Sequence, residues 1–194
     1  FSEQAIGRLK KYQARDMDTS VAMMIIDIDD FKHINDSFGH PQGDRLLAIV
    51  SRRIRQTLDS HIVVGRFGGD EFTLFFDKGV KEHLIENTAT VLLKTLAKPI
   101  MFDGANIEVR ASAGFVISKA NRCDLDWLLK RADLALYASK RDGKSKWSMF
   151  HGQMDRDYNE RKKMKDALRE ALKNGELSLA YQPVIDLRTR KVAG

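Results

Sequence analysis

The sequence predicts an α+β fold, in which one sheet of βαββαβ order carries helices on both faces. Short apolar runs that are typical of buried strands alternate with longer stretches whose apolar residues recur at helical spacing. Two of the short runs are separated only by a turn around Gly68 and Gly69, so they form an antiparallel hairpin at the centre of the sheet.

The first half of the chain contains a helix, a strand, two more helices and the hairpin. Residues 2–15 have helical spacing, and the apolar run over residues 20–29, which ends in acids, is typical of a central strand. The stretch "DFKHINDSFGH" begins a helix, which a glycine interrupts before a second amphipathic helix over residues 42–58. In "GRFGGDEF" the glycines form the turn of the hairpin, which presents Asp70 and Glu71 at its tip.

The next part of the chain completes the predicted sheet. Residues 80–97 are helical, residues 107–118 form a strand, and residues 124–140 form another amphipathic helix that ends before Gly143. Taken together, the elements follow the βαββαβ order of a ferredoxin-like sheet, which is also the layout of a nucleotidyl-transfer palm.

The character of the sequence changes near residue 150. A highly charged helical stretch over residues 155–175 precedes "ELSLAYQPVIDL", which predicts a new strand over residues 176–187. We therefore predict one domain over residues 1–150, followed by a linker helix and the first strand of a second domain over residues 151–194.

The composition is that of a soluble globular protein. Of the 194 residues, 43% are hydrophobic and 31% are charged. The longest apolar stretch, "VAMMII", is too short to span a bilayer, and no secretory pattern opens the chain. The single cysteine, Cys123, excludes an internal disulfide and fits a reducing cytoplasm. We expect a cytoplasmic location, which leaves open a membrane anchor elsewhere in a longer parent protein.

The net charge of +6 raises the question of a polyanionic partner. Most of the Lys and Arg clusters lie at helical spacing among apolar residues, as on solvated helix faces. No zinc-finger, basic-zipper or helix-turn-helix pattern is present, and no aromatic residues are interleaved with the basic ones. We therefore expect no nucleic-acid partner.

Carboxylates from two parts of the chain converge in the predicted topology. The end of the first strand lies beside the tip of the hairpin, so Asp27, Asp29, Asp70 and Glu71 meet at one edge of the sheet. Taken singly, each acid is equally typical of a cap or a turn. Because Asp27 and Asp70 both follow buried strands at this edge, together they predict a site for Mg²⁺ or Mn²⁺, with room left for phosphates.

Polar groups for a nucleotide lie close to these acids. The N–H groups of Asp30, Phe31 and Lys32 open a helix and can bind phosphate. Gly68 and Gly69 let a ligand approach the backbone closely. On the adjoining helices, a carboxylate at Asp44 can accept both N1–H and N2–H of guanine, and the carboxamide of Asn35 can complement its edge; each is also an ordinary helix-end residue.

Three separated stretches form a specific combination, "DIDDFKHINDSFGHPQGDRLL", "GRFGGDEF" and "ADLALYASKRDGK". The combination resembles the GGDEF family, the diguanylate cyclases of bacterial signalling, over roughly residues 1–150. The resemblance implies that two GTP molecules, one on each subunit of a facing homodimer, are joined into cyclic di-GMP with release of pyrophosphate.

The resemblance assigns roles to individual residues. Asp27 and Asp70 correspond to metal carboxylates, the Ile28 carbonyl to a further ligand, and the acid at position 71 lies close by. The guanine-reading pair corresponds to the residues at positions 35 and 44. Lys140 and Lys144 correspond to cations on the triphosphate, although arginine is more usual at Lys144. From the residues alone, these lysines are equally good partners for a helix dipole.

The implied reaction is in-line attack of a 3′-hydroxyl on an α-phosphorus, with Asp70 or Glu71 accepting the proton. A monomer is expected to bind GTP without making product. The family's inhibitory product site has Arg and Asp where this chain has Asp59 and Ile62, so feedback through that site is not expected. The family's usual N-terminal turn segment is absent before Phe1, and "GKSK" replaces its usual Gly-Arg-Asn.

The C-terminal stretch "LREALKNGELSLAYQPVIDL" resembles the opening of an EAL phosphodiesterase domain. The chain ends before that domain's Glu-Ala-Leu motif and metal ligands, so we expect no phosphodiesterase activity in it and a parent protein of the tandem GGDEF–EAL type. Such tandems leave a second hypothesis open, in which the GGDEF domain binds GTP without cyclising it and regulates the linked phosphodiesterase.

Overall fold

The computed structural model describes residues 1–14, 18–102 and 105–192. The chain divides into two compact units, Phe1–Asp155 and Arg156–Gly194. The described helices and strands are, in chain order, α1 (Ser2–Gln13), β1 (Ser20–Ile28), α2 (Phe31–Phe38), α3 (His40–Thr57), β2 (Val63–Gly68), β3 (Glu71–Phe76), α4 (Glu82–Leu96), β4 (Ile100–Phe102), β5 (Ala105–Ile107), β6 (Ala111–Lys119), the 3-10 turn η1 (Ala120–Arg122), α5 (Leu125–Arg141), β7 (Trp147–Met149) and α6 (Gly152–Lys173).

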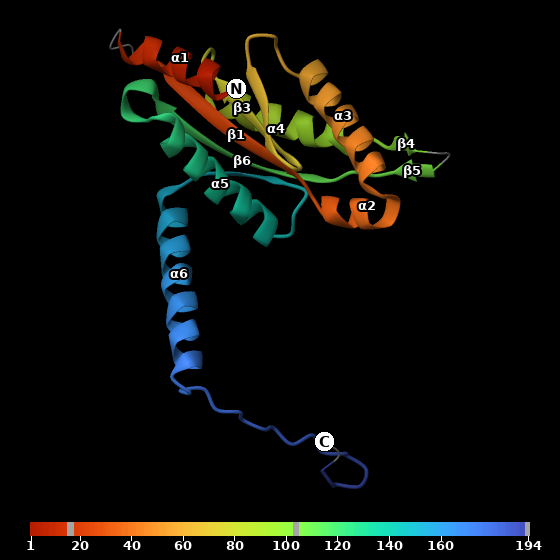
Figure 1. Ribbon diagram of the computed structural model, residues 1–194. Coiled ribbons are helices and arrows are strands. Elements are labelled where there is room, and N and C mark those ends of the chain that lie inside the picture. Colours follow the sequence, from red (N-terminus) through yellow and green to blue (C-terminus); the bar gives the residue numbers. More distant parts are fainter. Residues whose placement is uncertain (15–17, 103–104, 193–194) are drawn as a thin grey trace. The chain divides into compact units, whose positions relative to one another are not determined.

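The first unit is built on a five-stranded sheet of order β2-β3-β1-β6-β7 (Figure 1). The central strand β1 pairs antiparallel with β3 on one side and with β6 on the other. The hairpin β2–β3 therefore lies beside β1, and the α+β class and βαββαβ order predicted from the sequence are confirmed. The short strand β7 extends the sheet by pairing parallel with β6.

Helices cover both faces of this sheet because β1 is apolar on both sides. Alternate residues of a strand point to opposite faces. Ala22 and Met24 pack in a core with residues of α2, α3 and α4, whereas Val21 and Met23 pack in a second core with residues of α1 and α5. A side chain at Gly114 of β6 would collide with the backbone of α5, so the glycine lets this helix lie directly against the sheet.

The structure corrects several expected boundaries. The strand predicted over residues 107–118 begins only at Ala111, and Ile107 belongs to a separate hairpin of β4 and β5. The helix predicted over residues 2–15 ends at Gln13, and Arg15 lies outside the described residues. The two helices flanking Gly39 are confirmed, with α3 beginning slightly earlier than expected.

The strand predicted over residues 176–187 is wrong for this chain. The described residues of this stretch form only an isolated bridge between Ile185 and Val192. Leu179 and Tyr181 are highly exposed, so the apolar pattern lacks the neighbouring strands or helices that a sheet needs.

The second unit contains the C-terminal part of α6 and the segment that follows it. None of the described residues of α6 is buried, and its apolar side chains Met164, Leu168 and Leu172 are exposed. Among the helices in the described ranges, none combines the length and apolar character needed to cross a membrane.

Candidate active site

The end of β1 and the tip of the β2–β3 hairpin meet, as the sequence predicts. Asp27 lies opposite Glu71 in the register of β1 and β3, and the Ile28 amide donates to the Asp70 carbonyl at 3.3 Å. Asp70 lies in the turn itself, whereas Glu71 is already the first residue of β3. The chain thereby places three acids from two elements at one edge of the sheet.

The hairpin tip has a backbone that depends on its glycines. Gly68 ends β2, and Gly69 has a φ of +48°, which lies in the left-handed region. The pairing of β2 with β3 shifts register between Arg66 and Gly68, and the Arg66 Nε donates to the Gly69 carbonyl at 2.7 Å. The bulge and this hydrogen bond brace the turn that carries Asp70.

The acids at this edge lack a full complement of positive charge. Burial raises the pKa of Asp27, which is 5% exposed, while Lys140 opposes the rise with its Nζ 2.7 Å from Oδ1 and Asp70 adds to it. Burial also raises the pKa of Glu71, followed by repulsion from Asp27 and Asp133. Added positive charge would therefore stabilise these carboxylates in their ionised form.

The donor set fits a small hard cation that takes few protein ligands. The carboxylate of Asp70 lies close enough to raise the pKa of Asp27, and Ile28 follows Asp27 at the end of β1. Within residues 1–14, 18–102 and 105–192, no group of three or more His, Cys, Asp or Glu side chains is arranged to hold a metal. Mg²⁺ commonly binds through one or two protein carboxylates and completes its coordination with substrate phosphates. A site with two carboxylates therefore suits Mg²⁺.

Asp29 lies close enough to Asp27 to raise its pKa, as strand alternation predicts, but its carboxylate makes hydrogen bonds within the protein. Its Oδ1 accepts a hydrogen bond from the Ser112 hydroxyl at 2.7 Å, and its Oδ2 accepts one from the Ser145 amide at 3.0 Å. Both partners are distant in sequence, so no local pattern in the sequence indicates these hydrogen bonds. The carboxylate of Asp29 therefore connects the end of β1 to β6 and to the segment after α5.

The start of α2 lies next to these acids. The helix begins at Phe31, and Asp30 precedes it with a φ of +57° and no side-chain capping bond. The first N–H groups of a helix have no partner within it, so those at Phe31 and Lys32 suit an anion. The structure thus brings the predicted phosphate-binding backbone to the edge that holds Asp27.

Two lysines reach this edge from the end of α5 and the turn that follows. Lys140 pairs with Asp27 at 2.7 Å, and Lys144 pairs with Asp30 at 2.6 Å. The hydrogen bond from Lys144 lowers the pKa of Asp30, and the same bond raises the pKa of Lys144. Each lysine forms an ion pair with a particular acid, so its position is not explained by the helix dipole alone.

Asn35 faces the neighbouring helix α3. Its Oδ1 is buried and has no hydrogen-bond partner among the described residues. A side chain at Gly43 would collide with this oxygen, so the glycine makes room for the carboxamide. Asp44 follows directly and is exposed. A buried acceptor without a donor is costly, so the orphaned oxygen points to a donor supplied by a ligand.

Residues 2–146 match the family described as "Diguanylate cyclase, GGDEF domain". The chain belongs to the GGDEF family. Its fold and family place this GGDEF domain among the proteins of cyclic di-GMP signalling.

Two curated relatives show how the GGDEF domain occurs in longer proteins. The chain is 36% identical over 192 residues to the cyclic di-GMP phosphodiesterase NbdA of Pseudomonas aeruginosa, which covers 99% of this chain and 24% of NbdA. It is 32% identical over 184 residues to the bifunctional diguanylate cyclase/cyclic di-GMP phosphodiesterase MucR of the same organism, which covers 94% of this chain and 26% of MucR. The chain spans about a quarter of the length of these relatives.

Solved structures have the same fold. The GGDEF domain of TpbB, or YfiN, from Pseudomonas aeruginosa matches with a TM-score of 0.75 at 26% identity, covering 82% of this chain and 92% of that one. An EAL/GGDEF domain protein from M. capsulatus matches with a TM-score of 0.64 at 36% identity, covering 77% of this chain and 97% of that one.

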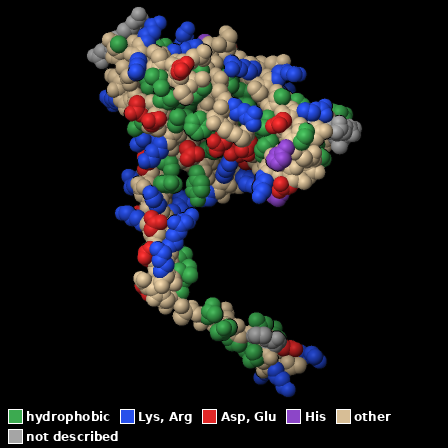
Figure 2. All heavy atoms as spheres, viewed as in Figure 1, with side chains coloured by type: hydrophobic (Ala, Val, Ile, Leu, Met, Phe, Trp, Pro, Cys, Tyr) green, Lys and Arg blue, Asp and Glu red, His purple; other side chains and the backbone are tan. Residues whose placement is uncertain are grey.

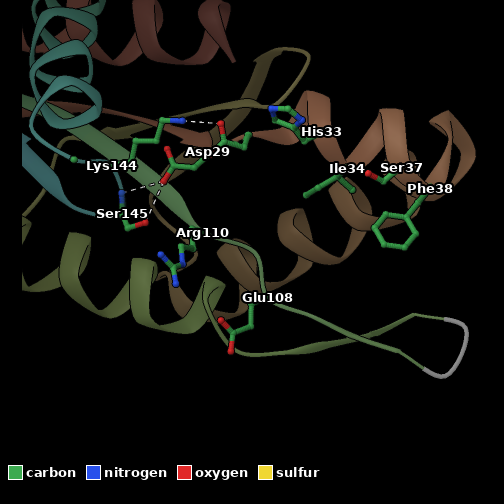
Figure 3. A pocket seen from close by; sticks show the side chains of 11 residues that line it. Asp29, His33, Ile34, Ser37, Phe38, Glu108, Arg110, Lys144 and Ser145 are labelled. Atoms are coloured by element: carbon green, nitrogen blue, oxygen red, sulfur yellow. Dashed lines mark hydrogen bonds and ion pairs between the residues drawn. The ribbon is translucent and has the colours of Figure 1, made fainter. Parts of the chain in front are cut away.

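The GGDEF domain has a pocket of about 540 Å³ beside the start of α2 (Figure 3). Asp30 and Lys144 line it, whereas Asn35 does not, so the pocket and the predicted guanine pair use different sides of α2. On the face of the first unit shown in Figure 2, Asp and Glu side chains gather with Lys and Arg side chains around them. The pocket is lined by Asp29, Asp30, His33, Ile34, Ser37, Phe38, Glu108, Arg110, Gly143, Lys144 and Ser145.

Sequence reasoning missed two kinds of residue at this edge of the GGDEF domain. Asp133 acts on Glu71 from α5, and a signal for it exists, because it lies two helical turns before Lys140 on the same helix. Ser112 and Ser145 bind Asp29, and although Ser145 lies in "GKSK", no local pattern indicates that either serine contacts this acid.

Proposed function

We propose that this GGDEF domain condenses two GTP molecules into cyclic di-GMP and pyrophosphate, as a homodimer and with Mg²⁺ or Mn²⁺. The observation that carries the proposal is the meeting of Asp27, Asp70 and Glu71 with Lys140 at one edge of the sheet. Acids in excess of cations suit a metal, and a second lysine beside the start of α2 suits the phosphates that such a metal accompanies.

The residues that would hold the metal are Asp27 and Asp70 through their side chains and Ile28 through its carbonyl. When bound, the ion lowers the pKa of the attacking 3′-hydroxyl and neutralises charge on the phosphates. Burial raises the pKa of Asp27, and repulsion from Asp70 and Asp29 adds to the rise, which supports this assignment.

The triphosphate is held by the start of α2 and by the two lysines. The N–H groups of Asp30, Phe31 and Lys32 donate to phosphate oxygens, and Lys140 and Lys144 leave their acid partners to pair with the phosphates. The bare backbone at Gly68 and Gly69 admits the substrate close to the hairpin. The ion pairs with Asp27 and Asp30 support this assignment because they already bring both ammonium groups to this edge.

The guanine base is read by Asn35 and Asp44. The carboxylate accepts N1–H and N2–H of guanine, and adenine has no such pair of donors. The buried, unpartnered Oδ1 of Asn35 supports a ligand donor at this place.

Glu71 accepts the proton of the 3′-hydroxyl, whereas Asp70 would bind the metal. Burial raises the pKa of Glu71, and a raised pKa makes a carboxylate a stronger base near neutral pH. Each domain holds one nucleotide, so the two halves of the reaction meet only when two domains face each other.

The domain extends over residues 1–150, and residues 151–194 lead into an EAL domain of a longer parent protein. The EAL/GGDEF protein from M. capsulatus and the bifunctional relative MucR support this arrangement.

A second candidate function is a GTP-binding regulator that makes no product. It is favoured by the relative NbdA, which is named a phosphodiesterase and matches 99% of this chain. Lys144 also favours this candidate. Lysine stands where arginine is usual in the family, and it binds phosphate less firmly because it lacks the bidentate guanidinium group.

The test is to incubate the purified chain with GTP and Mg²⁺ over a range of protein concentrations and to measure cyclic di-GMP and pyrophosphate by chromatography. A cyclase predicts one cyclic di-GMP for every two pyrophosphates, and a rate that rises faster than linearly with protein. GTP binding without product would replace the cyclase with the regulator. Absence of both would overturn the nucleotide site.

A further inference from the structure

Asp29 is a buried acid that ties together three separate parts of the GGDEF domain. Its side chain lies just beyond the end of β1 and is 8% exposed. Oδ1 accepts from the Ser112 hydroxyl of β6 at 2.7 Å, and Oδ2 accepts from the Ser145 amide at 3.0 Å. Its own amide donates to the Arg110 carbonyl at 2.9 Å.

The turn that Asp29 reaches has an unusual backbone. Gly143, Lys144 and Ser145 have φ angles of +114°, +59° and +54°. Residues other than glycine rarely adopt this left-handed region, and they do so where surrounding contacts hold them there. Two consecutive side-chain-bearing residues in this region therefore need bonds that fix them.

Asp29 and Ser112 supply such bonds from inside the protein. The Ser145 amide donates to the Asp29 carboxylate and also lies 3.1 Å from the Ser112 hydroxyl oxygen. On the other side of the turn, the Lys144 amide donates to the Ser139 carbonyl at 3.2 Å. The turn is thus held at both of its non-glycine residues.

The held turn determines where the Lys144 ammonium group lies. Lys144 Nζ is 2.6 Å from Asp30, at the start of α2 and on the wall of the pocket described above. Figure 3 shows Lys144 and Ser145 extending from this turn on the side of the pocket where Asp29 lies. Rotation of the turn into an ordinary backbone conformation would move this ammonium group away from α2.

We propose that Asp29 is a positioning residue, which through Ser112 and Ser145 holds the Gly143–Ser145 turn and so places Lys144 at the phosphate site. Its two carboxylate oxygens are already bonded inside the protein, so this role requires no contact with metal or substrate. The hydrogen bonds alone hold the turn, whereas placing Lys144 at phosphate rests on the proposed function.

The first test reads the turn without any nucleotide. Trypsin cleaves after lysine, so the rate of cleavage after Lys144, followed by mass spectrometry in the native full chain, reports how firmly the turn is held. Asp29→Asn is expected to raise that rate about tenfold, because local opening becomes easier when a fixing bond is lost. Asp77→Asn is the matched control, since Asp77 is equally buried but pairs with Arg8 away from this turn.

Ser112→Ala provides a second variant that removes one donor and keeps the charge of Asp29. It is expected to raise cleavage after Lys144 in the same direction, and it replaces Asp29→Asn in every comparison if that variant fails to fold. If the folded variants cleave after Lys144 at the wild-type rate, or if Asp77→Asn raises cleavage equally, the turn is held by something else and the proposal is overturned.

The second test separates positioning from general destabilisation. GTP affinity is measured by calorimetry for Asp29→Asn, for Lys144→Ala and for the double variant. Lys144→Ala is expected to weaken binding about tenfold, as loss of a charged hydrogen bond does, and adding Asp29→Asn should weaken it no further. Additive losses would show that Asp29 acts independently of Lys144 and would overturn the positioning role. Absence of GTP binding by the wild type would instead remove the proposed function and leave the trypsin result to decide the turn.

Discussion

Two buried aspartates at opposite ends of the hairpin strand β3 have opposite electrostatic surroundings. Asp77, just beyond one end, is 4% exposed and lies 3.2 Å from the Arg8 guanidinium, with the Tyr12 hydroxyl donating at 3.3 Å. Asp27, opposite the other end, is equally buried and pairs with Lys140, but Asp70 and Asp29 repel it, and burial raises its pKa. The structural acid is matched by partners, whereas the acid at the site is left short of positive charge. This contrast is the basis for proposing that a metal ion binds beside Asp27 and not beside Asp77.

The largest expected effect is the loss of product formation in Asp70→Asn. If Asp70 holds the metal, the rate of cyclic di-GMP formation should fall by roughly 10³-fold, because metal stabilisation of the transition state contributes several kcal/mol. The measurement is product formation under saturating GTP and Mg²⁺. Asp77→Asn is the control and should keep its activity below its melting temperature. Retention of Mg²⁺-dependent turnover in Asp70→Asn would show that the acids at the hairpin do not bind the metal.

A smaller effect is expected on base recognition in Asp44→Ala. Loss of a bidentate acceptor for guanine should reduce the preference for GTP over ATP by between about tenfold and a hundredfold. Competition of ATP against GTP binding measures this preference. An unchanged preference would remove Asp44 from the guanine site and leave the orphaned Oδ1 of Asn35 to be explained differently.

The two aspartates should also differ in their effect on stability. Asp77→Asn should lower the free energy of unfolding by about 2 kcal/mol, a value below that of a fully buried pair because the Arg8 side chain is 37% exposed. Asp27→Asn should change it by less than about 1 kcal/mol, since removing a desolvated charge offsets the lost ion pair. Urea unfolding without metal measures both. Equal losses would contradict the contrast between the two ends.

The raised pKa values of the acids at the site should make the stability of the domain depend on pH. Burial raises the folded-state pKa of Asp27 and of Glu71 above the ordinary values of 3.8 and 4.5. The folded state then binds more protons than the unfolded state in this window, so these two groups lower stability as pH rises from their ordinary values through their raised ones. The difference in melting temperature between the wild type and the Asp27→Asn, Glu71→Gln double variant, scanned from acid to neutral pH, isolates their part. A difference that does not change with pH would contradict the raised values.

The smallest effect is expected at Asp59. Because Ile62 is buried and apolar and no arginine occupies position 59, we expect no inhibition by product through the site that the family resemblance implies. Asp59→Ala should leave inhibition by added cyclic di-GMP unchanged within error, as measured in the product assay. A change in inhibition constant would restore a feedback site at this place.

The sequence predicted those parts of the structure that depend on local pattern. The apolar strand β1 and the glycine turn at Gly69 are visible as periodicity and turn chemistry, and they are enough to bring Asp27 beside the hairpin tip. The short strand β7 was not predicted. Three residues are too few to show a period, and its pairing depends on β6, which is distant in the sequence.

Two misses have a physical cause in long-range contact. The role of Asp29 depends on Ser112 and Ser145, which are 83 and 116 residues away, so alternation along β1 placed Asp29 beside Asp27 but did not predict these bonds. The strand expected over residues 176–187 has the right apolar pattern but no partner to bond with among the described residues, and pattern alone does not make a sheet.

The most direct test of the central claim is Mn²⁺ binding measured by electron paramagnetic resonance on the wild type, Asp27→Asn and Asp77→Asn, without nucleotide. Asp27→Asn is expected to bind Mn²⁺ about tenfold or more weakly, whereas Asp77→Asn is expected to bind it as the wild type does. Equal binding by all three proteins would contradict the claim that the shortage of positive charge beside Asp27 marks a metal site.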